Sequence, residues 1–498
     1  MFALNRSTLP DPPKPAGAPP RAGVLQIGDG NFLRGFADWM IDLANEAGVL
    51  DAAVTLVPPL PANIIDPLNA QGGLFTVLTR GVQGGAPTTA RRIVRCVTRG
   101  VDPYRDPATL LACARDPKTR FVISNTTEAG IVYREQPCSA GEWPRSFPAQ
   151  VAALLLARFE ALGGQPDTGL VFLPCELIEA NGTTLREIVL RHARDWTLPQ
   201  DFSDWVTRHN HFLNTLVDRI VPGYPATEAD RLFAEFGYTD TLLVAAEPFH
   251  LWVIEGPERL ANEFPLHKAG LNVVWTDDLQ PYRTRKVRIL NGAHTASVLA
   301  AFCGGLDTVG EMMEDPVVSR FLQRVVFDEI VPFVPLPEAE RRGYAESVLE
   351  RFANPYIRHE LLSIALNSVS KWTVRVLPSL LDYIQAHGRA PAGLAFSLAA
   401  LLRFYRGRFD AAGEFVGQRE AGSYPIRDNR DVLDIFDTAW RDSAHARPAD
   451  AVPALLADAR LWGMDLQTVP ELAPRVARAL DRIETIGMRP ALTELLAG

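Results

Sequence analysis

Three polar residues that could do acid–base chemistry follow one another in the segment KVRILNGAH, residues 286–294. Lys286, Asn291 and His294 have the spacing K-x-x-x-x-N-x-x-H. At about 100° per residue of an α-helix, Asn291 lies roughly 140° and His294 roughly 80° around the axis from Lys286. The three side chains therefore share one side, where a lysine acid/base, an amide donor and an imidazole could converge on one substrate oxygen.

The helix that must position these residues is apolar on nearly every side, which is typical of a buried helix. Its apolar residues are Val287, Ile289, Leu290, Ala293, Ala296, Val298, Leu299, Ala300 and Ala301. Burial disfavours an ammonium group, so we expect the pKa of Lys286 to be lowered toward neutrality. Gly292 costs about 1 kcal/mol relative to Ala within a helix, which predicts that another group approaches the backbone there. The alternative is that none of the three residues is catalytic. Lys286 would then lie at the start of the helix, and Asn291 and His294 would be hydrogen-bonded core residues.

A strand, a glycine turn and a helix occur near the start of the chain. Residues 23–27 (GVLQI) are followed by Gly28-Asp29-Gly30 and then by apolar residues at helical spacing, with Asn31 as the predicted N-cap. In dinucleotide-binding units the first glycine permits a tight turn and the second lets the backbone approach a pyrophosphate. Leu33 stands where such motifs have a third glycine, so an ordinary strand-to-helix turn remains the alternative.

The second predicted strand, residues 54–60, favours NAD over NADP. Pro58 and Pro59 follow Val57, where dinucleotide-binding proteins often have a ribose-binding acid. No Lys or Arg occurs between Val54 and Thr79, so a 2′-phosphate would find no cation on this segment.

A third candidate ligand segment follows the buried strand in residues 120–130. That strand runs into Asn125, Thr126, Thr127 and Glu128. In an open α/β sheet, ligands bind just beyond the carboxyl ends of the strands. The alternative is a polar turn.

Strand and helix patterns alternate up to about residue 280, which predicts an α/β fold with an N-terminal Rossmann-like, doubly wound domain, residues 1–280. From residue 281 to 498 the pattern is mainly α-helical, which predicts a helical substrate and catalytic domain. The strands predicted in the first half include residues 75–81 and 91–100. The helices predicted in the second half are residues 286–302, 316–331, 338–352, 360–371, 377–386, 393–405, 432–441, 451–462 and 472–487. Residues 407–431, rich in Gly, Asp and Arg, predict an exposed loop.

Composition narrows the class of partner. The 498 residues carry a net charge of −9, which argues against nucleic acid or an anionic membrane as the main partner and favours a small molecule. Five widely spaced cysteines without a C-x-x-C pair predict neither a disulfide framework nor a metal site. The first twenty residues lack the apolar core of a signal peptide, and the longest apolar runs are too short to span a bilayer. We therefore expect a soluble cytoplasmic protein, either a monomer or a small homo-oligomer.

Five motifs along the chain resemble the mannitol dehydrogenase family of polyol-specific long-chain dehydrogenases. They are I-G-x-G-N-F-x-R (27–34), T-T-E-x-G (126–130), V-D-R-I-x-P (217–222), P-Y-x-x-x-K-x-x-x-x-N-G-x-H (281–294) and S-K (370–371). They occur in the family's order, and their spacing matches over nearly the whole chain. Further segments, among them PCELIEANG and NPYIRHELLSIALNSVSK, resemble the branch of the family that acts on keto-uronates.

The resemblance implies a metal-independent, NAD-dependent oxidoreductase that interconverts a keto-uronate, D-tagaturonate, and an aldonate, D-altronate. It implies Lys286 as general acid/base, Asn291 as oxyanion donor and His294 as a positioning group. Asp218 and Lys371 match substrate-contacting positions. A uronate also carries a carboxylate that needs a cation, for which Lys371, Arg375 and Arg358 are the candidates. The cofactor-binding positions implied are Ile27, Gly28, Gly30, Asn31, Phe32, Arg34, Asn125, Thr127 and Glu128.

Three departures separate this chain from the mannitol branch of the family. Leu177 replaces a second oxyanion asparagine, for which nearby Asn181 is a candidate substitute. Arg283 replaces a glutamate thought to relay protons, and Ser363 replaces a substrate-binding arginine. The alternatives left open are a fructuronate reductase, another polyol or mannitol-type dehydrogenase, and an NAD-binding protein without catalytic activity.

Overall fold

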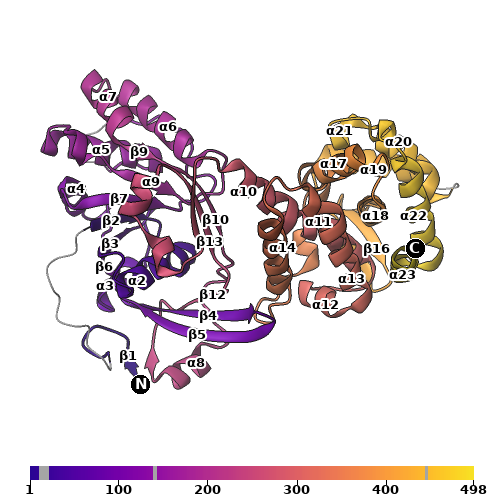
Figure 1. Ribbon diagram of the computed structural model, residues 1–498, viewed down its shortest axis with the longest axis horizontal. Helices are drawn as coiled ribbons and strands as arrows, with labels where there is room; N and C mark the ends of the chain where they lie inside the picture. Colours follow the sequence, from indigo (N-terminus) through magenta and orange to yellow (C-terminus); the bar gives the residue numbers. More distant parts are fainter. Residues whose placement is uncertain (10–21, 138–142, 443–446) are drawn as a thin grey trace. The chain divides into compact units, whose positions relative to one another are not determined.

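The computed structural model describes residues 1–9, 22–137, 143–442 and 447–498, and Cys138 lies outside these ranges. The chain divides into two compact units, Met1–Leu279 and Gln280–Gly498 (Figure 1). The first unit contains the parallel sheet and the second is mainly helical. The predicted fold class is confirmed.

The first unit is built on a six-stranded sheet in which every neighbouring pair is parallel. Its spatial order is β6 (Val97–Gly100), β3 (Ala52–Val57), β2 (Ala22–Ile27), β7 (Thr119–Ser124), β8 (Val171–Pro174) and β9 (His211–Phe212). In chain order these six strands read 3-2-1-4-5-6, the order of dinucleotide-binding folds. The order reverses between β2 and β7, so a ligand-binding crevice is expected beyond the carboxyl ends of these two strands.

Helices cover both faces of this sheet (Figure 1). One apolar core joins the sheet to α4 (Pro107–Arg115), α5 (Phe147–Leu162), α6 (Asn181–Asp195) and α7 (Gln200–His209). The opposite core joins it to α2 (Trp39–Glu46) and α9 (Glu258–Glu263), together with a small sheet of β10 (Asn214–Asp218), β13 (Leu251–Glu255) and β14 (Val273–Thr276). The parallel strands are therefore buried on both sides, which explains why they read as continuous apolar runs in the sequence.

The strand predicted over residues 91–100 is in fact two strands. Its first part ends β5 (Ala86–Val94), which pairs antiparallel with β4 (Phe75–Gln83), and its last part is β6 of the parallel sheet. The break lies at Arg95 and Cys96, whose main-chain N–H groups donate to the Asp42 carboxylate at 2.6 and 3.1 Å. These bonds replace the ladder bonds that a continuous strand would make.

Helices form most of the second unit, as predicted. They are α10 (Gln280–Arg285), η4 (Lys286–Asn291), α11 (Gly292–Cys303), α12 (Val309–Glu314), α13 (Pro316–Arg324), η5 (Val325–Ile330), η6 (Val331–Phe333), α14 (Glu338–Phe352), α15 (Leu361–Ile364), α16 (Ser368–Arg375), α17 (Leu377–His387), α18 (Ala392–Phe404), α19 (Arg430–Asp442), η7 (Pro448–Ala451), α20 (Val452–Ala457), α21 (Ala459–Trp462), η8 (Leu466–Thr468), α22 (Leu472–Ile486) and α23 (Met488–Ala497). At the centre α11 packs against α18, and both helices are buried along most of their length. Within the described ranges, no helix is long and apolar enough to cross a membrane.

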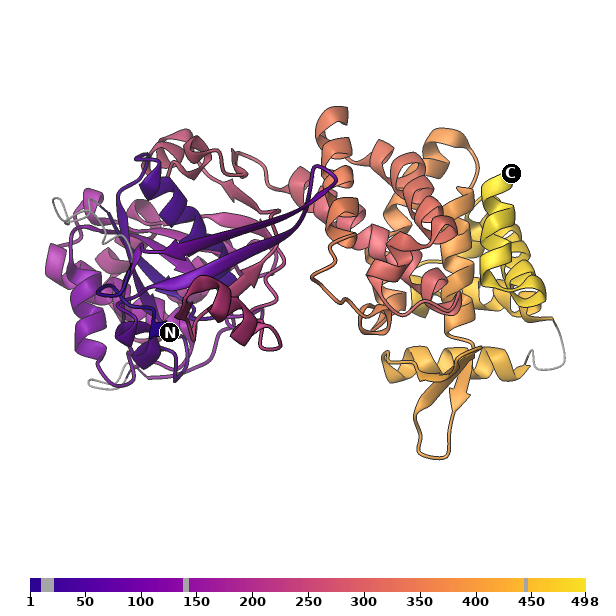
Figure 2. The ribbon, with the colours of Figure 1, turned by 90° about the horizontal axis from the view of Figure 1, so that it is seen from below.

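Several predictions for the second unit are wrong in detail, among them the helix over residues 451–462, which divides at Asp458 into α20 and α21. Residues 407–431 are not a plain loop, because β15 (Gly407–Phe409), β16 (Phe415–Arg419) and β17 (Gly422–Pro425) form an antiparallel sheet beside α19 (Figure 2). The Tyr424 ring packs so closely over Gly417 that a Cβ there would lie 2.5 Å from it, so a glycine that suggests a loop is required by the sheet. The helix predicted over residues 360–371 is interrupted, since Asn367 takes a left-handed conformation at φ 52° between α15 and α16.

Candidate active site

Lys286 and Asn291 lie at the two ends of a single π-helical turn, η4. Both side chains are partly buried. In a π-turn the hydrogen bonds run from residue i to i+5, so residue i+5 follows about one turn after residue i. An α-helix would separate the same two residues by roughly 140°. The plain α-helix predicted through residue 286 is therefore corrected, and the π-turn brings Lys286 and Asn291 closer to one face.

Gly292 follows this turn at the start of α11, where the end of α16 approaches it. An alanine Cβ at position 292 would lie 3.2 Å from the Arg375 carbonyl oxygen. The expected approach of another group to this backbone is therefore present. Arg375, on the approaching helix, is held close to the first turn of α11, and its guanidinium reaches Thr295 Oγ1 at 3.5 Å.

His294 lies one turn further along α11, between two aromatic rings. Its imidazole stacks on Phe352 with the ring centres 3.9 Å apart and the planes 7° apart, and it meets His359 edge-on at 5.5 Å. Its Nε2 atom is buried and has no hydrogen-bond partner among the described residues. Burial, reinforced by His359 and Arg351, holds the pKa of His294 well below its usual value, so the ring is neutral at physiological pH.

Cationic side chains from two other helices act on the same histidine. Arg351 on α14 and Lys371 and Arg375 on α16 all lower its pKa by their charge. Lys371 Nζ donates to the Ile364 carbonyl at 2.9 Å, and burial together with Arg375 lowers the pKa of Lys371. This part of the second unit is rich in positive charge and suits an anionic group such as a carboxylate.

Arg358 does not join this cluster. Its guanidinium pairs with Glu360 at 2.6 Å, and 77% of the side chain is exposed. Its neighbour His359 is the residue that meets His294. Sequence reasoning missed both His359 and Arg351, although Arg351 left a signal, since its spacing places it on the buried face of α14 with Val348.

In the first unit, the two glycines after β2 differ in what surrounds them. Gly28 has φ +145°, and an alanine Cβ there would lie 2.8 Å from Leu33 Cδ1 and 3.0 Å from the Asn125 carbonyl oxygen. Gly30 has no atom within 4 Å of its Cβ position. Gly30 also takes the N-cap position, so Asn31 is the first helical residue of α1 (Asn31–Leu33) and not the predicted cap.

Arg34 orients the Asn31 side chain at this turn. Arg34 begins the π-helix η1 (Arg34–Asp38), is 5% exposed, and donates to Asn31 Oδ1 at 2.7 Å and to the Leu242 carbonyl. Phe32, partly buried, stacks on Phe36 at 4.9 Å. Arg34 is engaged by protein oxygens, while the open space lies at Gly30.

The segment after β7 is held by a carboxylate that sequence reasoning missed. Glu176, 2% exposed, accepts bonds from Thr126 N and Oγ1, both at 2.9 Å, and from Ser124 Oγ at 3.0 Å. Asn125 Nδ2 donates to the Cys175 carbonyl at 2.8 Å. Thr127 has φ 75°, a strained conformation for a β-branched residue. The sequence did carry one sign of this role, since Glu176 is an acidic residue directly after the apolar run VFLPC.

Two other candidates in the first unit have clear surroundings. Asp218 ends β10 and is 5% exposed. Its neighbour Arg219 donates to the Glu247 carbonyl at 2.9 Å and the Gly35 carbonyl at 2.7 Å. Asn181 is 1% exposed, and its amide donates to the carbonyls of Pro174, Glu176 and Thr215. Asn181 is therefore a structural residue and not the substitute oxyanion donor.

These features fit a dinucleotide. The switch point lies between β2 and β7, Gly28 permits their close approach, and Gly30 leaves open backbone in front of a helix that runs on as α1, η1 and α2. No Lys or Arg that could bind the 2′-phosphate of NADP occurs between Val54 in β3 and Thr79. Among the described residues, no group of three or more His, Cys, Asp or Glu side chains is arranged to hold a metal ion.

The buried carboxyl group of Asp38, at the end of η1, should make the stability of the protein depend on pH. It is fully buried, and Gln26 Nε2 donates to its Oδ2 at 3.2 Å and to the Gly28 carbonyl at 3.1 Å. Gln26 Oε1 and Asp38 Oδ1 are both buried without a partner among the described residues. Burial raises the pKa of Asp38 from 3.8 to about 7. The folded state thus binds the proton more tightly than the unfolded state, and stability falls as pH rises from about 4 to about 7.

We expect Asp38→Asn to raise the free energy of unfolding at pH 8 by a few kcal/mol, since one pKa unit corresponds to about 1.4 kcal/mol. The amide is neutral at every pH, keeps an acceptor for Gln26 Nε2 and adds a donor for Gln26 Oε1. Urea titrations at pH 5 and pH 8 measure the effect, with the exposed Asp51→Asn as control. A gain of equal size at both pH values would contradict the titration of Asp38.

Comparison with known proteins agrees with this geometry. The profile described as "Mannitol dehydrogenase Rossmann domain" matches residues 22–268, and "Mannitol dehydrogenase C-terminal domain" matches residues 278–484. The altronate oxidoreductase of Yersinia enterocolitica is 45% identical over 99% of each chain. A D-sorbitol dehydrogenase structure covers 99% of this chain with a TM-score of 0.78 at 23% identity. Pseudomonas fluorescens mannitol 2-dehydrogenase, solved with NAD and D-mannitol, covers all of both chains with a TM-score of 0.67 at 25% identity.

The two profile matches follow one another along the chain and together take in both units. The curated relative matches from end to end, so no large segment of either protein lacks a counterpart. The chain belongs to the mannitol dehydrogenase family of oxidoreductases.

Proposed function

We propose that the protein is an NAD-dependent altronate oxidoreductase, or tagaturonate reductase, which interconverts D-tagaturonate with NADH and D-altronate with NAD⁺ in hexuronate catabolism. The observation that carries the proposal is the π-turn, which brings Lys286 and Asn291 toward one face in the same unit as Lys371 and Arg375. The end-to-end likeness to altronate oxidoreductases at 45% identity supports the choice of substrate. We place the enzyme in the cytoplasm, as a monomer or small homo-oligomer without a nucleic-acid or membrane partner.

NAD, when bound, supplies the hydride chemistry at the substrate carbon. The protein must then handle a proton and a developing negative charge on oxygen. Lys286 Nζ gives a proton to the nascent alkoxide during reduction and removes it during oxidation. The Asn291 amide donates a hydrogen bond to the same oxygen, a contribution whose loss typically costs about 10²- to 10³-fold in rate. His294, neutral and packed between Phe352 and His359, holds the substrate or Lys286 in register.

A uronate differs from a polyol in its carboxylate, which needs a cation. Lys371 and Arg375 supply this charge in our proposal, with Arg351 adding to the local potential. Asp218, buried at the end of β10, matches a substrate-contacting position of the family and is kept as a substrate-binding candidate of the first unit. Arg358 is left out, because it is exposed and paired with Glu360.

The alternatives differ in substrate or in activity. A fructuronate reductase or a polyol dehydrogenase would use the same lysine and asparagine on another ketone. A catalytically silent NAD-binding protein would not need the Lys286, Asn291 and His294 constellation. The altronate assignment is favoured because the curated relative that matches end to end is an altronate oxidoreductase.

A substrate panel tests the proposal. We expect NADH absorbance to fall with D-tagaturonate faster than with D-fructuronate or D-fructose, and NADH to be preferred to NADPH. Arg375→Ala should raise KM for tagaturonate at least tenfold and leave fructose turnover little changed, because only the uronate carries the carboxylate. Arg358→Ala is the matched control and should be silent. Absence of tagaturonate turnover, with fructose or fructuronate reduced instead, would refute the assignment.

A further inference from the structure

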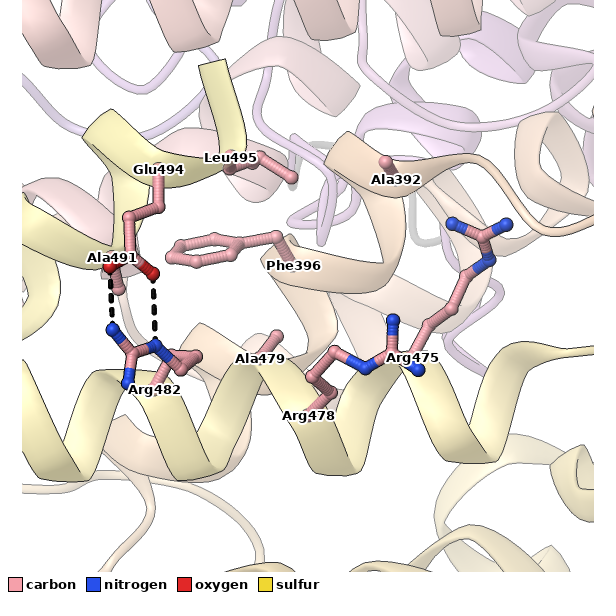
Figure 3. A pocket seen from close by; sticks show the side chains of 9 residues that line it. All are labelled: Ala392, Phe396, Arg475, Arg478, Ala479, Arg482, Ala491, Glu494 and Leu495. Carbon is pink, nitrogen blue, oxygen red and sulfur yellow. Dashed lines mark hydrogen bonds and ion pairs between the residues drawn. The ribbon is translucent and has the colours of Figure 1, made fainter. Parts of the chain in front are cut away.

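A cavity of about 250 Å³ lies between α18, α22 and α23, and none of the proposed catalytic residues lines it (Figure 3). Its apolar lining includes Phe396, Ala479, Ala491 and Leu495. Three arginines from α22 complete it, Arg475, Arg478 and Arg482. A concave site that joins an aromatic ring to convergent polar groups is the usual form of a small-molecule site, and this one is smaller than drug-sized pockets of about 300–1,000 Å³.

The arginines share a face because their spacing is i, i+3 and i+7 along α22. The opposite face of α22 carries Leu472, Val476, Leu480 and Ile483, which are buried. Burial of that apolar face fixes the rotation of the helix, so the three guanidinium groups are turned toward the cavity by the fold and not by chance side-chain motion.

Two of the three charges are compensated within the protein. Arg475 pairs with Glu471 at 2.8 Å, and Arg482 pairs with Glu494 through two bonds at 2.9 and 2.5 Å. Arg478 has no acidic or hydrogen-bonding partner among the described residues, so the cavity keeps about one positive charge. In Figure 3, Arg475 and Arg478 extend toward one end, and the Arg482–Glu494 pair and the Phe396 ring lie toward the other.

We infer that this cavity binds a small organic monoanion with an apolar group, such as an aromatic carboxylate. The carboxylate lies on the Arg478 guanidinium, with Arg475 beside it, since a planar guanidinium matches a carboxylate with two hydrogen bonds. The apolar group lies against Phe396 and Leu495. The inference does not depend on the proposed reaction, because the cavity and the catalytic candidates share no residue.

Benzoate is the test probe, compared with benzyl alcohol, which lacks the charge, and acetate, which lacks the ring. We expect ligand-observed NMR titration of the full chain to show saturable benzoate binding, with both comparison compounds at least tenfold weaker. Arg478→Ala should weaken benzoate at least tenfold, as expected for loss of a charged hydrogen-bond partner, and Arg478→Lys should weaken it less. Arg389→Ala, another exposed arginine of the second unit, should bind like the wild type.

The cationic cluster near His294 could also bind a carboxylate, so Arg478→Ala is compared with its parent in a Lys371→Ala background, where the tenfold loss of benzoate affinity should persist. Benzoate binding that is lost in Lys371→Ala and kept in Arg478→Ala would overturn the inference. Equal binding of benzyl alcohol would overturn the assigned charge. A dimer in sedimentation that Arg478→Glu dissociates, with no benzoate binding, would instead assign this surface to a second copy of the chain.

Discussion

We expect Lys286→Ala to lower the turnover of D-tagaturonate by about 10³-fold and to leave NADH binding close to that of the wild type. General acid–base catalysis contributes typically about 10²- to 10⁴-fold. The alanine variant has no group at this position that could protonate the alkoxide. Steady-state rates measure the first effect, and quenching or enhancement of NADH fluorescence on binding measures the second.

Two controls make this result specific. Lys118→Ala removes an exposed lysine of the first unit and should leave turnover unchanged. Adding a primary alkylamine to Lys286→Ala should restore part of the rate, since a small amine can replace the missing proton donor, whereas a purely structural defect would not respond. Near-normal turnover in Lys286→Ala would remove the acid/base assignment.

The sequence indicated the three residues proposed to be catalytic, Lys286, Asn291 and His294, but not the backbone that arranges them. The apolar pattern along residues 286–302 is equally compatible with an α-helix that contains one π-turn, because a helix that is apolar on nearly every side does not reveal a local shift in phase. The sequence also does not show the tertiary contact beside this turn, in which the Arg375 carbonyl packs against Gly292. The glycine at position 292 indicated that another group lies close to the helix backbone. Nothing near it in the sequence shows that this group is the Arg375 carbonyl.

The cationic cluster shows a second limit of sequence reasoning. Lys371 and Arg375 lie four residues apart on one helical face, so spacing alone brings them together. His359 and Arg358 are neighbours in an irregular segment, where no period tells which side chain turns inward. The structure turns His359 toward His294 and leaves Arg358 exposed, the reverse of the choice made from charge.

The parallel sheet was predictable because strands buried on both faces give continuous apolar runs between helical patterns. The division of residues 91–100 was not, since it depends on a carboxylate, Asp42, about fifty residues earlier in the chain. Glu176 acts in the same way on the segment after β7. In both places a buried acid replaces ladder or turn bonds, and its partners become visible only when the chain is folded.

Gly28→Ala is expected to weaken NADH binding at least about 100-fold. A side chain at position 28 would be strained at φ +145°, and its Cβ would lie 2.8 Å from Leu33 Cδ1 and 3.0 Å from the Asn125 carbonyl. The turn must then move away from β7, which widens the switch point where the dinucleotide is proposed to bind. Fluorescence titration with NADH measures the affinity, and thermal unfolding without cofactor measures the accompanying loss of stability.

Gly30→Ala separates the cofactor role of this turn from its structural role. Position 30 has open space around its Cβ and an ordinary φ of −66°, so the variant should unfold at nearly the wild-type temperature. NADH affinity should nevertheless fall about tenfold or more, because the added methyl occupies the space through which the backbone would meet the pyrophosphate. Gly343→Ala, at an equally open position within α14, is the matched control and should bind NADH normally, with stability equal to or above that of the wild type. Wild-type NADH affinity in both Gly28→Ala and Gly30→Ala would place the cofactor elsewhere.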